Sequence, residues 1–151
     1  MLLRIELSDF RSYRGDTAVE FSEFSAIVGP NGSGKSNLAA ALQFVLCGSA
    51  NDCVAVGQTK CRVAAILSTS KSVSEVQNNE DRFERILVAS TKKSSYYINS
   101  VQCSQTVYRD SLAERGIFAT LRNFLVLQGD VEQVAAQTPQ ALTRLVETVS
   151  G

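Results

Sequence analysis

The residues that could do chemistry in this sequence are concentrated in one short segment, GPNGSGKSN, at positions 29–37. Residues 29–36 fit the spacing G-x-x-x-x-G-K-[ST] at every fixed position, as a phosphate-binding loop does. Its glycines, Gly29, Gly32 and Gly34, let the backbone approach an anion with several N–H groups pointing inward. Lys35 would then bind the β- and γ-phosphates of a nucleotide, and the hydroxyl of Ser36 would ligate Mg²⁺.

The surroundings of this segment are those that a phosphate loop needs. A short apolar strand is expected at residues 25–28, and helical spacing of apolar residues follows over residues 35–47. The alternative is a glycine-rich turn that enters a helix and leaves its lysine exposed, but the complete motif favours nucleotide binding. The predicted contacts are Gly29, Pro30, Asn31, Gly32, Ser33, Gly34, Lys35 and Ser36, with Asn37 directed either to the phosphates or to the sheet.

A second segment, FLVLQGDVE at positions 124–132, presents Gln128 at the end of an apolar strand. Nucleotide-binding proteins often carry a carboxylate that helps hold magnesium at such a place, and Asp130 comes two residues too late. The local pattern alone leaves three interpretations open: a degraded carboxylate motif, an ordinary polar strand end, or a different device.

Bulk composition restricts the class of protein. The 151 residues fit one domain, and 44% apolar with 20% charged residues is typical of a globular chain. Fifteen basic residues balance fifteen acidic ones, so any attraction to nucleic acid must come from a local patch. Histidine is absent, and the four cysteines lack zinc spacing and are expected as reduced thiols. No signal peptide or membrane-spanning run is recognised.

The expected elements give an α/β architecture that includes an antiparallel layer. A glycine at position 48 is placed to end the helix that follows the phosphate loop. A polar insertion is expected at residues 68–81 and a last helix from Thr138 and Pro139 onward. Strands are expected at residues 2–7, 17–21, 25–28, 63–67, 83–89, 96–98 and 101–103, and a helix at residues 104–115.

Several phrases taken together resemble the N-terminal head segment of SMC (structural maintenance of chromosomes) proteins. They are GPNGSGKSN, the upstream ELSDFRSYRG, the strands EDRFERILVAS and YYINSVQ, and RNFLVLQGDVEQVAAQTP near the end. Among SMC types, these sequence segments are most similar to subunit one of cohesin. The resemblance covers residues 2–151, is very specific at both ends, and is weak between positions 48 and 79.

This resemblance implies an ABC-type P-loop ATPase head, of which the chain would be the N-terminal half as a single domain, and it implies ATP and Mg²⁺ as cofactors. Gln128 would be the Q-loop residue, whose carboxamide oxygen ligates Mg²⁺ together with Ser36. Arg11 and Ser12 would lie near the phosphates, although by themselves they also fit a hairpin turn. Asp130 would then be a turn or cap residue.

Implied partners are a C-terminal lobe of the same chain, a second SMC head, a kleisin-type subunit and, through the complex, DNA. The implied location is the nucleus, on chromosomes, with a coiled coil following the head. Lys60, Arg62, Lys92 and Lys93 fit solvated strand ends as well as a DNA-binding patch, and residues 47–59 contain no basic residue.

Three functions are therefore weighed. The first is half of an ATPase head that needs a C-terminal lobe, because no Walker B strand and no Leu-Ser-Gly-Gly signature are found in the sequence. No catalytic base is recognised either. The second is a divergent or truncated module that binds nucleotide without turnover. The third, an unrelated P-loop kinase or NTPase, would need a substrate lid and a carboxylate at a strand end.

Overall fold

The structure is a computed structural model that describes residues 1–46, 48, 50–68, 80–117, 138 and 140. Its chain divides into two compact units, Met1–Tyr108 and Arg109–Gly151. All the elements named below belong to the first unit, except that the boundary falls within the last helix.

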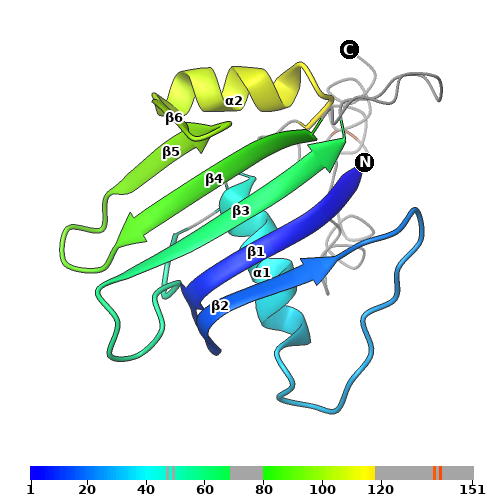
Figure 1. The fold of residues 1–151 in the computed structure, drawn as a ribbon, viewed down its shortest axis with the longest axis vertical. Helices are drawn as coiled ribbons and strands as arrows, with labels where there is room; N and C mark the ends of the chain where they lie inside the picture. Colours follow the sequence, from blue (N-terminus) through cyan, green and yellow to red (C-terminus); the bar gives the residue numbers. More distant parts are fainter. Residues whose placement is uncertain (47, 49, 69–79, 118–137, 139, 141–151) are drawn as a thin grey trace. The chain divides into compact units, whose positions relative to one another are not determined.

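A six-stranded antiparallel sheet forms the centre of the first unit (Figure 1). Its strand order is β2-β1-β3-β4-β5-β6, so hairpins and one long connection between β2 and β3 build the whole layer. The elements along the chain are β1 (Leu2–Phe10), β2 (Tyr13–Glu20), α1 (Lys35–Val45), β3 (Lys60–Ser68), β4 (Glu80–Val88), β5 (Ser94–Ile98), β6 (Val101–Cys103) and α2 (Gln105–Ala113).

Helix α1 crosses one face of this sheet and contacts β1, β3 and β4 (Figure 1). Its buried residues Leu38, Ala41, Phe44 and Val45 recur at helical spacing, which gives the helix one apolar stripe. In β4, buried and less buried residues alternate with period two, and every second residue from Asp81 to Leu87 is buried. The ring of Phe10 lies 5.5 Å from that of Phe44 and ties β1 to the helix.

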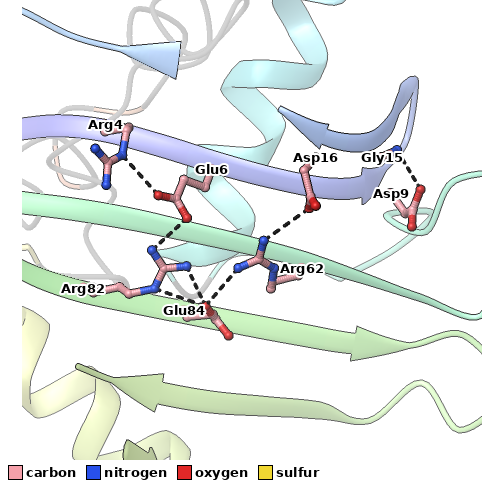
Figure 2. A network of polar contacts seen from close by, with 8 residues as sticks. All are labelled: Arg4, Glu6, Asp9, Gly15, Asp16, Arg62, Arg82 and Glu84. Atoms are coloured by element: carbon pink, nitrogen blue, oxygen red, sulfur yellow. Dashed lines mark hydrogen bonds and ion pairs between the residues drawn. The ribbon is translucent and has the colours of Figure 1, made fainter. Parts of the chain in front are cut away.

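The opposite face of the sheet carries a network of alternating charges (Figure 2). Glu6 accepts hydrogen bonds from Arg82 at 2.7 Å and from Arg4 at 3.1 Å. Glu84 pairs with Arg82 at 2.8 Å and with Arg62 at 3.6 Å, so one chain of charges links β1, β3 and β4. Arg62 also reaches Asp16 on β2 at 3.3 Å.

The sequence-based expectations hold for most strands. The antiparallel layer is confirmed, as is the hairpin at Asn99 and Ser100, both of which have positive φ angles as a two-residue turn of this kind requires. Helix α1 ends at Val45, two residues earlier than expected. Residues 69–79 of the expected insertion and almost all of the expected last helix lie outside the described residues.

The expected strand at residues 25–28 is wrong. No ladder pairs with this segment in the part of the chain that the structure describes, and Val28 is 87% and the preceding Phe24 89% exposed. Apolar β-prone residues form a strand only when a neighbouring strand accepts their backbone hydrogen bonds. The segment therefore has β-prone residues but no neighbouring strand among the described residues.

Cys53, Cys61 and Cys103 are free thiols, as expected, while Cys47 lies outside the described residues. Burial raises the pKa of Cys61 to about 12, so this thiol stays protonated and packs as a small apolar group. Among the described residues, no helix is long and apolar enough to cross a membrane.

The charge network makes stability depend on pH through Glu6. Partial burial works to raise the pKa of Glu6, but the hydrogen bonds and charges of Arg82 and Arg4 outweigh it and hold this pKa below its ordinary value of 4.5. The lowered pKa means that Glu6 stabilises the fold above that value and loses its contribution as pH falls through the folded-state pKa. We expect Glu6→Gln to lower the free energy of unfolding by roughly 0.5–1 kcal/mol at neutral pH and by nothing in acid.

Urea unfolding of the wild type and of Glu6→Gln, from about pH 7 to about pH 3, measures this difference in the free energy of unfolding. Glu20→Gln is the matched control, because Glu20 is exposed on β2 and makes no ion pair within the described ranges. A deficit for Glu6→Gln that persists unchanged in acid would contradict the proposed cause.

Candidate nucleotide-binding site

The loop before α1 has a backbone that suits close approach to an anion. Gly34 is the N-cap of the helix with φ 99°, and Gly32 has φ 83°, a left-handed region that other residues enter only at a cost. Gly29 is needed for a different reason, because a Cβ there would lie 2.8 Å from the hydroxyl of Ser33. The cap residue has no side chain to bind the N–H groups of Lys35 and Ser36, whereas the Asn37 N–H donates to the Gly34 carbonyl oxygen at 2.9 Å.

Lys35 closes over this loop from the first turn of the helix. Its ammonium group donates to the carbonyl oxygens of Gly29 at 2.6 Å and Pro30 at 2.7 Å. An ammonium has three N–H donors, so two hold the loop in shape and one is left for an anion. Lys35 makes no ion pair in the part of the chain described, and its charge is therefore not neutralised by a carboxylate.

The turn between β1 and β2 meets the start of α1 from the other side. Asn37 donates from its amide to the Ser12 hydroxyl at 2.7 Å, and its carbonyl oxygen accepts from Arg11 at 3.5 Å. The Tyr13 hydroxyl lies 3.4 Å from the carbonyl oxygen of Gly34. A segment 20 or more residues upstream thus braces the first turn of the helix.

Arg11 is itself fixed by its backbone. It has φ 49°, and its N–H donates to the carbonyl oxygen of Cys53 at 2.8 Å, while Ala55 donates to Asp9 at the same distance. These bonds attach the turn to the loop that follows α1. The guanidinium group stays exposed, 5.8 Å from the centre of the Phe10 ring, and can turn toward an anion.

These groups fit a nucleotide phosphate with Mg²⁺. Within the described residues the site offers the N–H groups at a helix start, the positive charges of Lys35 and Arg11, and the exposed hydroxyl of Ser36. No carboxylate pairs with either cation in this part of the chain. Such a set of donors is suited to an anion and would repel a free cation.

Among the predicted site residues, the structure joins Arg11 and Ser12 to Asn37, and it joins Lys35 to Gly29 and Pro30. It also settles the orientation of Asn37, whose side chain turns to the β1–β2 turn and not to the sheet. Gln128 lies outside the described residues, so its predicted place in the site stays a prediction. Tyr13 was missed, although the aromatic residue in SYRG directly follows two candidate residues and could have drawn attention.

Comparison with known proteins gives consistent matches. The family described as RecF/RecN/SMC N-terminal domain matches residues 1–121. Structural maintenance of chromosomes protein 1 of Arabidopsis thaliana is 38% identical and that of Schizosaccharomyces pombe 35% identical, each over 99% of this chain. The chain spans only 13% and 14% of those two relatives.

Solved structures agree. The Smc head domain with an extended coiled coil from Pyrococcus furiosus, bound to the C-terminal domain of ScpA, superposes with a TM-score of 0.82 and 27% identity. That match covers 99% of this chain and 42% of the other. A structure from work on ATP-driven dimerization and DNA-stimulated activation of SMC ATPases gives 0.81 and 26% identity over 97% of both chains. The expected α/β head-type fold is thereby confirmed.

The contact between Gly34 and Tyr13 can be tested with a pair of alanine substitutions. Gly34→Ala adds a left-handed alanine whose Cβ would lie 3.1 Å from the Tyr13 hydroxyl oxygen, whereas at Gly32 nothing lies within 4 Å of such a Cβ. Gly34→Ala and Gly32→Ala should each lower the free energy of unfolding by about 1–2 kcal/mol through backbone strain. Gly34→Ala should lower it by about 1 kcal/mol more, because of the close contact with Tyr13.

Urea unfolding of both variants, alone and combined with Tyr13→Ala, measures the difference. In the Tyr13→Ala background the two glycine substitutions should have equal cost. An excess cost of Gly34→Ala that survives the removal of Tyr13 would show that the ring does not contact this glycine.

Proposed function

The chain belongs to the RecF/RecN/SMC N-terminal domain family as an SMC head segment, and from that premise we propose that it binds Mg-ATP at residues 29–37. In this proposal residues 1–151 are one domain, the N-terminal half of a cohesin-type SMC ATPase head. The single observation that carries it is the start of α1. The uncapped N–H groups of Lys35 and Ser36, the remaining ammonium donor of Lys35 and the exposed Ser36 hydroxyl lie there, without a neutralising carboxylate in the described ranges.

Each residue has a distinct role in this proposal. Residues 29–34 would cradle the phosphates with their N–H groups, and Lys35 would donate its third N–H to them. Arg11 would add a second positive charge, close to Asn37, which also binds Ser12. Ser36 and Gln128 would ligate the Mg²⁺ ion. When bound, ATP would contribute the phosphoryl group whose hydrolysis the complete head carries out.

The exposed segment before the loop supports completion by another lobe. Phe24, Ile27 and Val28 are 89%, 47% and 87% exposed and lead directly into Gly29. A second lobe that packed here would bury these side chains, which stabilises the assembly by about 25 cal/mol for each Å² of apolar surface removed from water. A neighbouring strand of that lobe would also pair their backbone groups. We assign this role to the C-terminal lobe of an SMC chain, which would also bring the Walker B carboxylates.

The names of relatives extend the proposal to partners. One similar structure is an SmcHead bound to the C-winged helix domain of ScpA, with a TM-score of 0.76 and 27% identity. A kleisin-type subunit, a second SMC head and chromosomal DNA in the nucleus are therefore the proposed partners and place of action. Direct DNA contact by this segment is not part of the proposal, because residues 47–59 contain no basic residue.

The proposed binding of phosphate by Lys35 can be tested by removing the charge of this side chain. Lys35→Ala should reduce the affinity for Mg-ATP at least about 100-fold, because a charge-assisted contact and the bonds that shape the loop are both lost. Isothermal titration measures this change. Lys60→Ala, an exposed lysine at the start of β3, is the control and should bind as the wild type does. Equal affinities of the wild type and Lys35→Ala would refute phosphate binding by Lys35.

Turnover is expected only after completion of the head. Residues 1–151 should show no ATP hydrolysis above background, and the activity should appear when a C-terminal lobe with a Walker B strand and signature motif is added in trans. Phosphate release measures both states. Turnover by residues 1–151 alone would reveal a catalytic base in this chain, and binding without turnover in the completed head would favour the non-hydrolysing module.

A further inference from the structure

The far end of α1 is held by a buried arginine. Arg85 lies on β4 at a position of the sheet face that packs against the helix, and only 6% of it is exposed. Its guanidinium group donates to the carbonyl oxygen of Phe44 at 2.8 Å and to that of Gly48 at 2.9 Å. A third bond runs to the hydroxyl of Ser94 at 3.0 Å.

No carboxylate pairs with Arg85 in the part of the chain that the structure describes. A buried charge without a counter-ion needs other compensation, and here it comes from the partial negative charge at the helix C-terminus. The rings of Phe44 and Tyr96 lie 4.3 Å and 5.3 Å from the guanidinium carbon and add cation–π attraction. The arginine is therefore bound to the helix end by charge, hydrogen bonds and stacking.

Two further features belong to the same arrangement. The hydroxyl of the fully buried Tyr108 donates to the carbonyl oxygen of Val45 at 2.9 Å, so a second side chain binds the last turn. Gly48 has to be glycine, because a Cβ there would lie 2.5 Å from the carbonyl oxygen of Gln43. We call Arg85, Tyr108 and the carbonyl groups that they bind the C-terminal clamp of α1.

Apolar packing and hydrogen bonding restrain a helix differently. The stripe of Leu38, Ala41 and Phe44 holds α1 against the sheet, but apolar contacts are non-directional and tolerate small slides and rotations. Nη1 of Arg85 donates to two carbonyl groups, one in the last turn and one just beyond it, and the planar guanidinium group fixes the directions of these bonds. The helix is 11 residues and about 16 Å long, so an axial shift at Val45 is transmitted to Lys35 and Ser36.

We propose that Arg85 is a positioning residue for the phosphate loop, which sets the axial position of α1 and thereby the place of Lys35 and Ser36. The inference rests on the proposed nucleotide binding and deepens it, because it makes β4 and α2 sensitive to what is bound at the other end of the helix. By thermodynamic linkage, a ligand that fixes the helix start also strengthens the C-terminal clamp.

Hydrogen exchange tests the positioning role without any nucleotide. Arg85→Met removes the charge and the guanidinium donors, and it should raise the exchange rates of the Asn37 and Leu38 amides, which donate to Gly34, by about tenfold. Arg85→Lys keeps the charge but loses the planar guanidinium geometry, and it should give an intermediate rise. Slow amides of β1 and β3 report the global stability, and the rise at the helix start should exceed theirs.

Arg82→Met is the matched control, because Arg82 has the same residue type on the same strand but lies in the charge network on the other sheet face. It should leave the ratio of helix-start to strand exchange unchanged. If Arg85→Met does not fold, Tyr108→Phe removes one hydrogen bond of the same clamp and should raise the same two rates by a smaller factor.

Titration with Mg-ATP then separates this inference from the proposed function. Arg85→Met should bind about tenfold more weakly than the wild type, measured at a temperature where both are fully folded. Unchanged exchange at Asn37 and Leu38, or a rise only in proportion to the strands, overturns the positioning role whatever the titration shows. A wild-type chain that does not bind Mg-ATP overturns the proposed function, while the exchange ratios still decide the role of Arg85.

Discussion

The hydrogen bonds that Arg85 and Tyr108 donate to the last turn of α1 decide what the first turn can do. A helix leaves carbonyl groups unpaired at its C-terminus and N–H groups unpaired at its N-terminus. Here the carbonyl groups are bound from within the fold, whereas Gly34 gives the N–H groups no capping side chain. The helix is thus satisfied at the buried end and left receptive at the exposed end, where Lys35 adds a positive charge. An anion at that end completes the pairing that the fold leaves open.

The two faces of the sheet divide the work of supporting this helix. The covered face is apolar, and Arg85 is tolerated there only because helix carbonyl groups and two rings surround it. The other face is tied together by side chains of alternating charge, which bridge β1, β3 and β4 without a net charge that would attract nucleic acid. Since β4 carries Arg85 on one face and Arg82 and Glu84 on the other, it links the surface network to the clamp of α1.

Local patterns in the sequence predict local features well. The spacing of the glycines with Lys35 and Ser36 predicts the phosphate loop, and period-two alternation predicts most strands, because both depend on short-range geometry. The strand at residues 25–28 could not be judged in this way, since its existence depends on a neighbour and not on its own residues. Arg85 was equally hidden. The alternation in FERILV places it on the apolar face, but only the fold shows that a helix end meets it there.

The contrast between the formed loop and the exposed segment before it explains how nucleotide chemistry would be tied to assembly. Residues 29–37 hold their shape through bonds within the first unit, from Lys35 to its own loop and from Asn37 to the β1–β2 turn. Phe24 and Val28, only a few residues earlier, are left to water. In the proposed function, this lobe would hold phosphates by itself, while its exposed apolar surface favours association with another lobe. In the proposed function, binding therefore belongs to this lobe, and hydrolysis belongs to the assembled head.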